Sequence, residues 1–249
     1  MARIIVINSG KGGVGKTTTA INLGASLNKL KREVIIMDAN LNTPNIGLQL
    51  GAPIVPITLN HVLKGKADIE DAIYEHHSGT KIVPSSLSVS ELTNFNVKKL
   101  PGIAQALGAL CDYVIIDSAA GFGEEVMAVL EASDEIIIVT NPEMPAVTDA
   151  LKAVKVAREM GKNVNGVIVT RHTNAKYEMP LSSIKSMLET QIIGVIPEDK
   201  SVKEALNLRD AVSHTHPRSK VARKYLEIAR KVNGDAEERV GFLERVFGR

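Results

Sequence analysis

The stretch Gly10-Lys11-Gly12-Gly13-Val14-Gly15-Lys16-Thr17 decides the fold class of this 249-residue chain. It matches the pattern G-x-x-x-x-G-K-[ST], whose glycines let consecutive backbone N–H groups turn toward the phosphates of a nucleotide. In that pattern Lys16 reaches the β- and γ-phosphates, and the Thr17 hydroxyl binds Mg²⁺. An apolar run at residues 4–7 predicts a buried strand before the loop, and residues 18–27 predict a helix after it. This order of strand, loop and helix is the context that a phosphate-binding loop requires.

The rest of the chain alternates between strand-like and helical patterns. Apolar runs predict six further strands, at residues 34–37, 81–83, 113–116, 136–139, 167–169 and 192–196. Apolar residues at three- and four-residue spacing predict helices at residues 97–110, 124–132, 146–160 and 180–188. Such alternation predicts an α/β fold with a doubly wound, mostly parallel sheet and helices on both faces. Ligands of such folds bind at the carboxyl ends of the strands.

Composition and charge indicate a single globular unit. Because 44% of the residues are hydrophobic, the chain can bury a full core, and we expect one nucleotide-binding domain over residues 1–233. The single cysteine, Cys111, excludes a disulfide framework, and the sequence shows neither a leader pattern nor an apolar run long enough to span a membrane. These features predict a cytoplasmic protein. A net charge of +2 makes nucleic acid an unexpected partner.

Two aspartates end predicted strands beside the loop. Asp38 follows the run at 34–37, and Asp117 follows the run at 113–116. A carboxylate at this edge of the sheet faces the loop and can hold Mg²⁺ directly or through its waters. We therefore expect Thr17, Asp38 and Asp117 to form the metal site, with Asp117 as the Walker B aspartate.

A second lysine, Lys11, indicates which kind of phosphate-binding loop this is. The sequence Gly-Lys-Gly-Gly-Val-Gly-Lys-Thr-Thr at residues 10–18 resembles the deviant Walker motif of the MinD/ParA family of ATPases, and the resemblance covers essentially the whole chain. The resemblance to this family also rests on residues 1–6, 140–143 with Asp149, 170–171, 194–199 and 241–248. The resemblance implies ATP and Mg²⁺ as cofactors. It also implies a homodimer formed with ATP, in which Lys11 crosses to the partner's nucleotide.

The resemblance implies roles for residues in and around the loop. The nucleotide-binding set within the loop is Gly10, Lys11, Gly12, Gly13, Val14, Gly15, Lys16, Thr17 and Thr18. Residues 118–121 resemble the family's switch II, in which the N–H of Gly121 senses the γ-phosphate, although Ala120 stands where the family usually has proline. The family's adenine pocket corresponds to Thr170, Arg171, Pro197, Glu198 and Asp199. Residues 141–143 and Asp149 also match the family, but an ordinary turn and helix start explains them better than a direct contact does.

Asn40 departs from the family pattern. The family carries a second aspartate two residues beyond Asp38, in switch I, where it positions the attacking water, whereas this chain reads Asp38-Ala39-Asn40. An amide can orient a water but cannot accept its proton, so tight ATP binding with slow turnover is one expectation. A polar turn residue is the other. The catalytic set that we expect is Lys11, Lys16, Asp38, Asn40 and Asp117.

The tail has a different pattern from the domain before it. Asn233-Gly234-Asp235 begins a linker, and residues 234–249 then alternate between charged and apolar positions. The apolar residues that fall within an arc of about 160° on a helix are Val240, Phe242, Leu243, Val246 and Phe247. This predicts an amphipathic helix that targets a membrane surface, so the protein would be peripheral on the inner face of the cell membrane. Joining two copies in an ATP dimer would turn weak contacts into avid ones.

Several functions remain open at this point. One is a MinD-like ATPase that cycles on and off a membrane and positions unidentified regulator or cargo proteins, for example in cell-division site selection. Another is a ParA-like ATPase that partitions DNA or other cargo, which needs a basic surface rather than an amphipathic tail. Loss of hydrolysis through Asn40 would instead leave an ATP-dependent scaffold. A metallocluster carrier of the same superfamily needs paired cysteines, which one cysteine contradicts.

The histidines form two short clusters, at residues 76–77 and at residues 214 and 216. Neither cluster has the cysteine or helix-borne glutamate partners that are typical of zinc motifs. We therefore expect solvated loop residues and no zinc site. Cys111 precedes a buried strand and is expected to be a small core residue.

Overall fold

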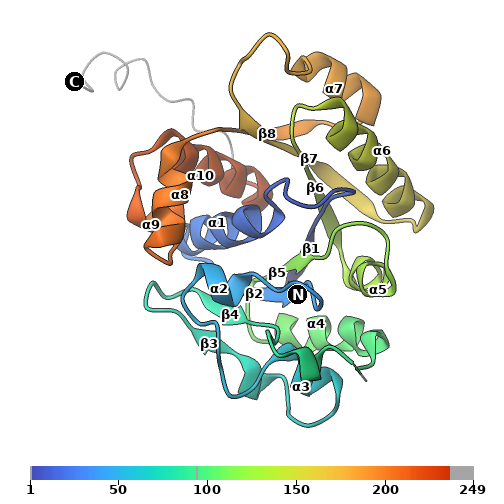
Figure 1. The fold of residues 1–249 in the computed structure, drawn as a ribbon, viewed down its shortest axis with the longest axis vertical. Coiled ribbons are helices and arrows are strands. Elements are labelled where there is room, and N and C mark those ends of the chain that lie inside the picture. Colours follow the sequence, from blue (N-terminus) through green and yellow to red (C-terminus); the bar gives the residue numbers. More distant parts are fainter. Residues whose placement is uncertain (1, 94, 236–249) are drawn as a thin grey trace.

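A single mixed sheet organises the molecule (Figure 1). The computed structural model describes residues 2–93 and 95–235, and its strands follow the order β3-β4-β2-β5-β1-β6-β7-β8. All neighbouring strands are parallel except β3, which pairs with β4 in the antiparallel direction. The strands are β1 (Arg3–Asn8), β2 (Val34–Ala39), β3 (Tyr74–Glu75), β4 (Lys81–Val83), β5 (Tyr113–Ser118), β6 (Glu135–Thr140), β7 (Asn163–His172) and β8 (Ile192–Pro197).

The central strands are buried along their whole length. Every residue of β2 and β5 is buried, and their sequences, VIIMDA and YVIIDS, are rich in β-branched residues. Such residues pack well on a pleated surface, and near-continuous apolar runs are typical of parallel strands that are covered on both faces. The charged residues of these two strands, Asp38 and Asp117, stand near their carboxyl ends. The sheet therefore delivers two carboxylates to one edge.

Helices cover both faces of the sheet, which confirms the expected doubly wound fold. On one face lie α1 (Lys16–Lys29), α2 (Ile46–Gln49), α8 (Lys200–Asn207), α9 (Val212–Thr215) and α10 (Lys220–Asn233). On the other face lie α3 (Leu59–Leu63), α4 (Leu100–Gly108), α5 (Glu124–Ala132), α6 (Met144–Glu159) and α7 (Leu181–Leu188). Each face of the sheet has its own hydrophobic core. Ile5 and Ile7 of β1 pack in the core on the α1 face, and Ile4 and Val6 pack in the core on the α4 face, as the alternation of side chains along a strand requires.

The element bounds differ from the expected ones in a few places. The pattern at 97–110 divides into a 3₁₀ turn (Val97–Lys99) and α4, because Pro101 favours the first turn of a helix. Two further 3₁₀ turns span Glu70–Ala72 and Val89–Glu91. The strand β3 and the helices α2, α3 and α9 were not expected, since each has two to five residues and is too short to show a clear period. The longer helices α8 and α10 were not expected either.

Helix α10 ends the described part of the chain. Its buried residues recur at three- and four-residue spacing, and it stops at Asn233 with Gly234 in the left-handed conformation that commonly ends a helix. The expected membrane-binding face, from Val240 to Phe247, lies outside the described residues, so the division at 233–234 stays a prediction. Among residues 2–93 and 95–235, none of the helices has the length and apolar character needed to cross a bilayer.

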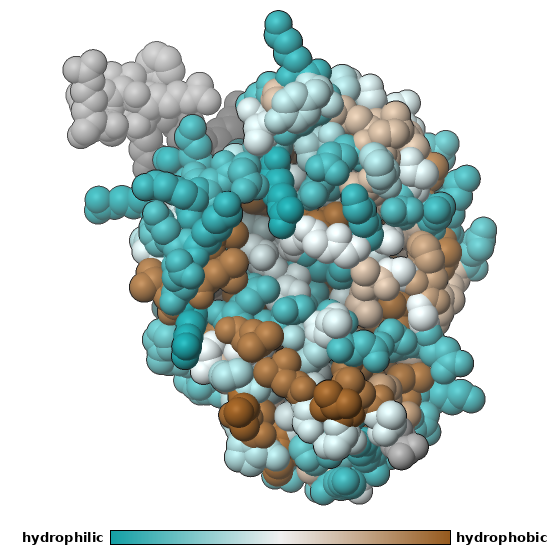
Figure 2. All heavy atoms as spheres, in the orientation of Figure 1, coloured by the Kyte–Doolittle hydropathy of each residue, from teal (hydrophilic) through white to brown (hydrophobic). Residues whose placement is uncertain are grey.

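The expected phosphate-binding loop sits at the middle of the sheet. It joins β1 to α1, and β1 lies between β5 and β6. Figure 2 shows a face that is hollowed near its centre, with apolar residues gathered in the lower part of the view. The segment 48–89 contains large apolar side chains that face solvent, above all Ile54 and Val89, which are 90% and 80% exposed. Such residues are candidates for a contact with another molecule.

Candidate nucleotide-binding site

The loop backbone has the conformation that its glycines permit. Gly13 and Gly15 have φ angles of 77° and 97°, a region that other residues rarely adopt. Gly15 is also the N-cap of α1 and has no side chain to bond the first N–H groups of the helix. These groups have no partner within a helix, and the helix dipole favours negative charge there. The start of α1 can therefore hold a phosphate.

A close backbone contact fixes the other end of the loop. A side chain at Gly10 would overlap the backbone carbonyl of Asp149 in α6. Glycine is required here because the loop and the helix touch at backbone distance. Asp149 was expected to be an ordinary helix residue. Its backbone also supports the loop, because α6 contacts Gly10 at this position.

Lys16 is buried beneath the loop. Its side chain reaches back to Ser9, whose Oγ lies 3.0 Å from Nζ, and the residue is 8% exposed. Burial lowers the pKa of this lysine, although the charge of Asp117 opposes the shift. A buried ammonium group is costly without an anionic partner. Its position at the start of α1 makes a phosphate the natural partner.

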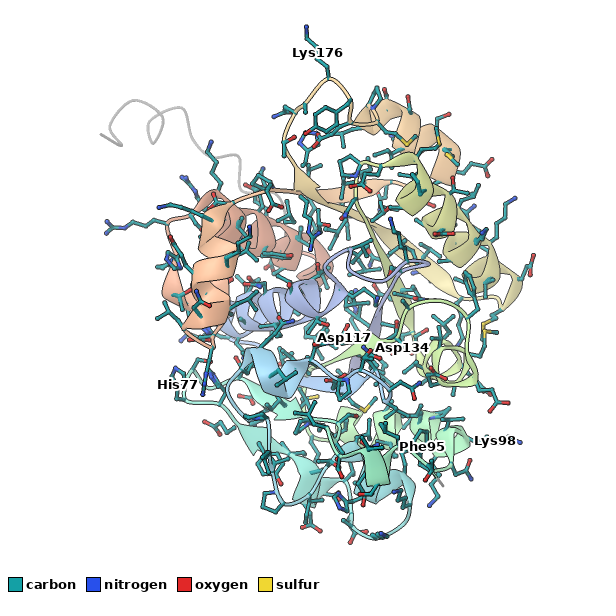
Figure 3. The ribbon with its side chains drawn as sticks, in the orientation of Figure 1. His77, Phe95, Lys98, Asp117, Asp134 and Lys176 are labelled. Atoms are coloured by element: carbon teal, nitrogen blue, oxygen red, sulfur yellow. The ribbon has the colours of Figure 1, made fainter. Side chains whose placement is uncertain are left out.

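Two aspartates lie side by side across the sheet. Asp38 of β2 is paired in register with Asp117 of β5 (Asp117 is labelled in Figure 3). The Thr17 hydroxyl donates to Oδ2 of Asp117 at 2.6 Å. Oδ2 of Asp38 accepts two backbone N–H groups, from Asn45 and Ile46, each at 2.9 Å. The structure therefore brings together the three residues that the sequence predicts for the metal site.

The electrostatics of this pair fit a divalent cation. Burial raises the pKa of Asp38, and the neighbouring charge of Asp117 raises it further. Burial also raises the pKa of Asp117, against the effects of Thr17 and Lys16. Oδ1 of Asp117 is buried, and among the described residues it has no hydrogen-bond partner. Mg²⁺ prefers carboxylate and hydroxyl oxygens, so Thr17, Asp117 and Asp38 have the donor atoms that this ion needs.

Lys11 narrows the family assignment and Asn40 departs from the family pattern, and both side chains make only local contacts. The Lys11 side chain is 44% exposed, and its ammonium group lies 3.9 Å from a carboxylate oxygen of Glu143. The side-chain amide of Asn40 donates to the carbonyl of Thr43 at 2.7 Å, and its Oδ1 lies 3.1 Å from the Thr43 hydroxyl. Asn40 is therefore held in a polar turn with Thr43, and its role toward the attacking water stays a prediction. Neither Lys11 nor Asn40 is held by the buried core.

Gly121 contacts the residue directly before the phosphate-binding loop. Its φ is 86°, and its N–H donates to the carbonyl of Ser9 at 3.3 Å. This bond places the expected switch II beside the loop, with Ser9 also contacting Lys16. Ser9 did not stand out in the sequence, because a serine before a glycine-rich loop is an ordinary residue.

A second part of the site is a pocket of about 320 Å³ next to the loop. Its wall combines loop residues with the ends of β7 and β8 and with α8 and α10. The lining residues are Val14, Gly15, Thr18, Thr170, Arg171, Ile196, Pro197, Glu198, Asp199, Val202, Lys203, Leu206 and Tyr225. The five residues that the sequence suggested for an adenine pocket are thus all in one wall. A pocket of this size and mixed lining can take a nucleoside.

Thr170 ties this pocket to the loop. Its hydroxyl lies 2.6 Å from the carbonyl oxygen of Val14 and 2.8 Å from Oδ1 of Asn141. Thr170 and Asn141 are both buried. Asn141 supports the loop through Thr170, and its place directly after β6 was the signal for this role.

Asp199 has a structural role in this wall. Its side chain accepts the backbone N–H of Ser201 at 2.9 Å and thereby caps α8. This hydrogen bond lowers the pKa of the carboxyl group. The wall residues of α8 and α10 were missed by sequence reasoning, because they belong to no motif and reach the loop only through the fold.

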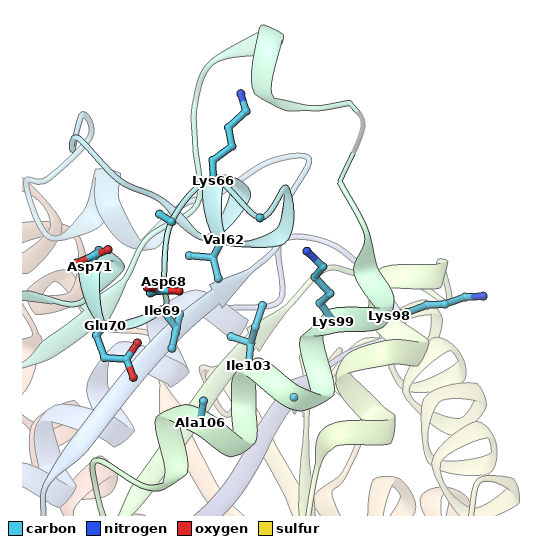
Figure 4. A pocket seen from close by; sticks show the side chains of 13 residues that line it. Val62, Lys66, Asp68, Ile69, Glu70, Asp71, Lys98, Lys99, Ile103 and Ala106 are labelled. Atoms are coloured by element: carbon cyan, nitrogen blue, oxygen red, sulfur yellow. The ribbon is translucent and has the colours of Figure 1, made fainter.

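A hollow larger than the nucleoside pocket lies elsewhere in the fold. About 880 Å³ of open space separates the segment around Glu70–Ala72 from α4 (Figure 4). Its rim carries lysines and acids, and Val62, Ile69 and Ile103 lie between them. No part of the phosphate-binding loop lines this hollow. Volume is therefore a poor guide to the nucleotide site in this molecule.

Comparison with known proteins agrees with the geometry. The fold and loop define a P-loop nucleotide-binding protein, and residues 5–211 match the family described as "CobQ/CobB/MinD/ParA nucleotide binding domain". The chain belongs to this family. An uncharacterised ATP-binding protein of Methanocaldococcus jannaschii is 38% identical over 94% of this chain and 89% of its own length.

Two solved structures are similar over nearly the whole chain. The septum site-determining protein MinD of Pyrococcus horikoshii, complexed with Mg-ADP, has a TM-score of 0.90 and 33% identity over 95% of this chain and all of its own. A MinC:MinD cell division protein complex of Aquifex aeolicus contains a chain with a TM-score of 0.86 and 27% identity, covering 94% of this chain and 97% of its own. The expected MinD/ParA family is confirmed. ATP and Mg²⁺, the cofactors expected from the sequence, are confirmed as those of the family.

Proposed function

We propose that this protein is a MinD-like ATPase that dimerises with ATP, attaches to a membrane through its C-terminal tail, and positions partner proteins, for example in cell-division site selection. One observation carries the proposal. A complete phosphate-binding floor, made of Lys16, Thr17, Asp38 and Asp117, is combined with a second lysine, Lys11, that faces solvent.

The floor binds the nucleotide within one chain. Lys16 and the free N–H groups at the start of α1 hold the phosphates, while the pocket beside Thr170 takes the nucleoside. Mg²⁺ held by Thr17, Asp117 and Asp38 compensates the negative charge that the phosphates bring to this buried site. Hydrolysis in such sites depends mainly on positioning and charge, so these residues supply most of the catalysis.

Lys11 supplies the link between two protomers. Its contact with Glu143 is long and exposed, and contacts of this kind contribute little to stability. The lysine can therefore exchange this partner for the phosphates of a second chain, where it compensates charge from the opposite side. The exposed Ile54 and Val89, in the segment 48–89, are further candidates for a contact with a second chain.

Asn40 sets the lifetime of the dimer. We infer that on ATP binding its amide leaves Thr43 and orients the attacking water. It cannot accept a proton, so turnover is slow and the ATP dimer persists. A long-lived dimer gives the paired tails time to hold the membrane by avidity.

The relatives support the cellular role. The Pyrococcus structure is named as a septum site-determining protein, and the Aquifex structure is a complex between MinD and a second cell division protein, MinC. We therefore expect regulators or cargo to bind the ATP dimer of this protein. The membrane rather than DNA is the expected surface for this cycle.

Liposome co-sedimentation with phosphate release tests the proposal. Full-length protein is mixed with anionic liposomes in the presence of ATP, ADP or no nucleotide, and phosphate is measured in the same samples. We expect the protein to sediment with the liposomes only in the samples that contain ATP. Deletion of residues 240–249, or Phe247→Glu, is expected to remove sedimentation but to spare ATP binding and dimerisation.

The matched control is Tyr177→Glu, which adds the same charge at a side chain that is 88% exposed in the loop between β7 and α7. It is expected to sediment like the wild type. If the truncated protein sediments as well as the intact one, the tail is not the membrane anchor. If the intact protein ignores liposomes but retards duplex DNA with ATP, a ParA-like partitioning function replaces this one. Absence of phosphate release with normal dimerisation would favour an ATP-dependent scaffold.

A further inference from the structure

Two pairs of polar side chains, from distant parts of the sequence, meet at one edge of the molecule. His76 and His77 follow β3, whereas Asp210 precedes α9 and His214 lies within it. Figure 3 shows His77 at the left edge, where the segment after β3 approaches α9. The expectation of solvated histidines is wrong for His76, whose side chain is 7% exposed, and Asp210 is 8% exposed. His77 is 72% exposed and therefore accessible from solvent.

The donor atoms of this cluster face one another. Nδ1 of His76 lies 3.9 Å from Oδ1 of Asp210, and Nε2 of His77 lies 3.6 Å from Oδ2 of the same carboxylate. One potential ligand atom from each of His76, His77 and Asp210 lies within 4.8 Å of the others. Donors around a tetrahedral zinc ion at about 2.0–2.1 Å are about 3.3 Å apart, so modest side-chain rotations bring them into range.

The surrounding contacts fix which atoms of the cluster can accept a metal ion. Nε2 of His76 lies 3.2 Å from the backbone carbonyl of Arg209, so this nitrogen carries the proton and Nδ1 is an acceptor. Nδ1 lies 2.7 Å from the Ser78 hydroxyl, and a bound metal ion would replace that hydrogen bond. Oδ1 of Asp210 accepts the backbone N–H of Ala211 at 2.6 Å and is 3.0 Å from Nδ1 of His214. These bonds orient the carboxylate so that Oδ2 faces His77.

We propose that His76, His77 and Asp210 form a Zn²⁺ site. The ligand atoms are Nδ1 of His76, Nε2 of His77 and Oδ2 of Asp210, with a water molecule in the fourth position. Imidazole nitrogen and carboxylate oxygen are ordinary zinc ligands, and His214 acts as the outer partner that holds the carboxylate. A pocket of about 360 Å³ that His76 and His77 help to line gives the ion a route from solvent.

The site would join two parts of the fold that are distant in sequence. The histidines belong to the β3–β4 edge of the sheet, and Asp210 leads into α9. Helix α9 contacts the helix of the phosphate-binding loop, because Ser213 Oγ lies 3.0 Å from Ser26 Oγ of α1 and the Ser213 carbonyl accepts a bond from Lys29. Zinc binding should therefore stabilise the folded chain as well as the site itself.

Zinc titration of the untagged, full-length protein tests the proposal. The protein is treated with a chelator, excess Mg²⁺ is added without nucleotide, and ZnCl₂ is titrated in competition with a chromophoric chelator. We expect one Zn²⁺ per chain. His77→Ala should weaken binding by more than about 100-fold, and His214→Ala by about 10- to 100-fold, since outer partners contribute that much to metal affinity. His77 is a safe position for substitution because most of its side chain is in solvent.

Two controls separate this site from others. His216→Ala removes a neighbouring histidine that pairs with Glu204 and lies outside the cluster, and it should bind zinc like the wild type. Asp117→Asn removes a ligand of the nucleotide site and should also leave zinc affinity unchanged. X-ray absorption at the zinc edge should show nitrogen and oxygen neighbours and no sulfur. Wild-type protein without micromolar zinc binding, equal binding by His77→Ala, or loss of binding in Asp117→Asn would overturn the proposal.

Zinc-dependent thermal stability gives a second readout on the same proteins. The melting temperature of the wild type should rise on zinc addition, and that of His77→Ala should not. Equal shifts in both proteins would place the stabilising ion elsewhere and count against the site.

Discussion

The floor and the rim of the nucleotide site are held in place by different forces. The floor consists of Lys16, Thr17, Asp38 and Asp117. All but the half-buried Thr17 are buried, and each makes a hydrogen bond to a neighbouring segment or to another floor residue. The rim consists of Lys11, Asn40 and Gly121. Lys11 and Asn40 make exposed or local contacts, and Gly121 makes a backbone hydrogen bond of 3.3 Å to Ser9. The floor is therefore built before any ligand arrives, whereas the rim can change partners. This difference assigns binding to the floor and the response to ATP to the rim.

Charge shows the same contrast. At the floor, two neighbouring carboxylates are buried together, and burial raises the pKa of both. At the rim, Lys11 keeps 44% of its side chain in solvent. Buried like charges are costly until a cation joins them, whereas exposed charges cost little to rearrange. Substitutions at the floor should consequently affect both stability and chemistry, and substitutions at the rim should affect function alone.

The largest effect is expected from Asp117→Asn. An amide can still accept the Thr17 hydroxyl but gives Mg²⁺ a weaker ligand, so ATP hydrolysis should fall by about 100-fold or more. The same change removes the repulsion between the two carboxylates, so the nucleotide-free protein should be at least as stable as the wild type. Phosphate release at saturating ATP, together with thermal melting without Mg²⁺, measures both effects. A variant that is inactive because it is unfolded would contradict this account.

The pH dependence of stability provides a second test of the floor. An aspartate with a raised pKa holds its proton in the folded state after the unfolded chain has released it, above the ordinary value of 3.8. The folded state then binds more protons, so the free energy of unfolding falls as pH rises toward the raised pKa values. This fall should be smaller in Asp117→Asn. Denaturant melts without Mg²⁺ between pH 4 and pH 8 would show it, and equal slopes for both proteins would exclude the coupling.

At the rim, Lys11→Ala should abolish ATP-induced dimerisation. Binding of ADP to a single chain should change by less than about threefold, because the exposed lysine contributes little within one protomer. Light scattering with ATP and a separate ADP titration measure the two properties. Lys176→Ala is the matched control, since Lys176 is exposed and points away from the molecule (Figure 3). A Lys11→Ala protein that still dimerises with ATP would remove the lysine from the interface.

The floor could be predicted from the sequence because its signals are local. The loop is a contiguous motif, and Asp38 and Asp117 each end an apolar run, so strand order alone brings them together. Seven of the strands and the helices α1, α4, α5, α6 and α7 followed from periodicity for the same reason. Asn141 was undervalued because its contact with Thr170 joins two strands and depends on their register.

Contacts between distant segments could not be predicted in this way. The nucleoside pocket uses α8 and α10, and no motif connects these helices to the loop. The histidine cluster joins residues 76–77 to Asp210, a separation that spacing rules do not cover. Short elements such as β3 and α9 show too few residues for a period, although they position these histidines. The sequence therefore predicts residues that belong to one motif or one strand end, but it does not predict which distant segments come into contact.

A smaller effect at the rim is expected from Asn40→Asp. The new carboxylate can accept a proton from water, and because phosphoryl transfer asks little of a base, single-turnover hydrolysis should rise by about tenfold rather than more. The ATP dimer should dissociate sooner and spend less time on liposomes. Asn42→Asp, the same change in the same loop, is the control and should leave the rate unchanged. A rate for Asn40→Asp equal to that of the wild type would show that this position does not orient the water.

The smallest effect concerns Thr170, which joins the floor to the nucleoside pocket. Thr170→Val keeps the volume of the side chain but removes the hydroxyl that lies 2.6 Å from the Val14 carbonyl. One neutral hydrogen bond contributes about 1 kcal/mol, so the Kd for ADP should rise by about fivefold while the rate constant of hydrolysis at saturating ATP stays the same. Calorimetric titration with Mg-ADP measures the affinity. Thr148→Val, at a half-buried position whose hydroxyl bonds to the Met144 carbonyl within α6, should bind ADP like the wild type. An unchanged Kd for Thr170→Val would mean that the glycine-rich backbone holds its shape without this tie, and the floor would then be independent of the pocket beside it.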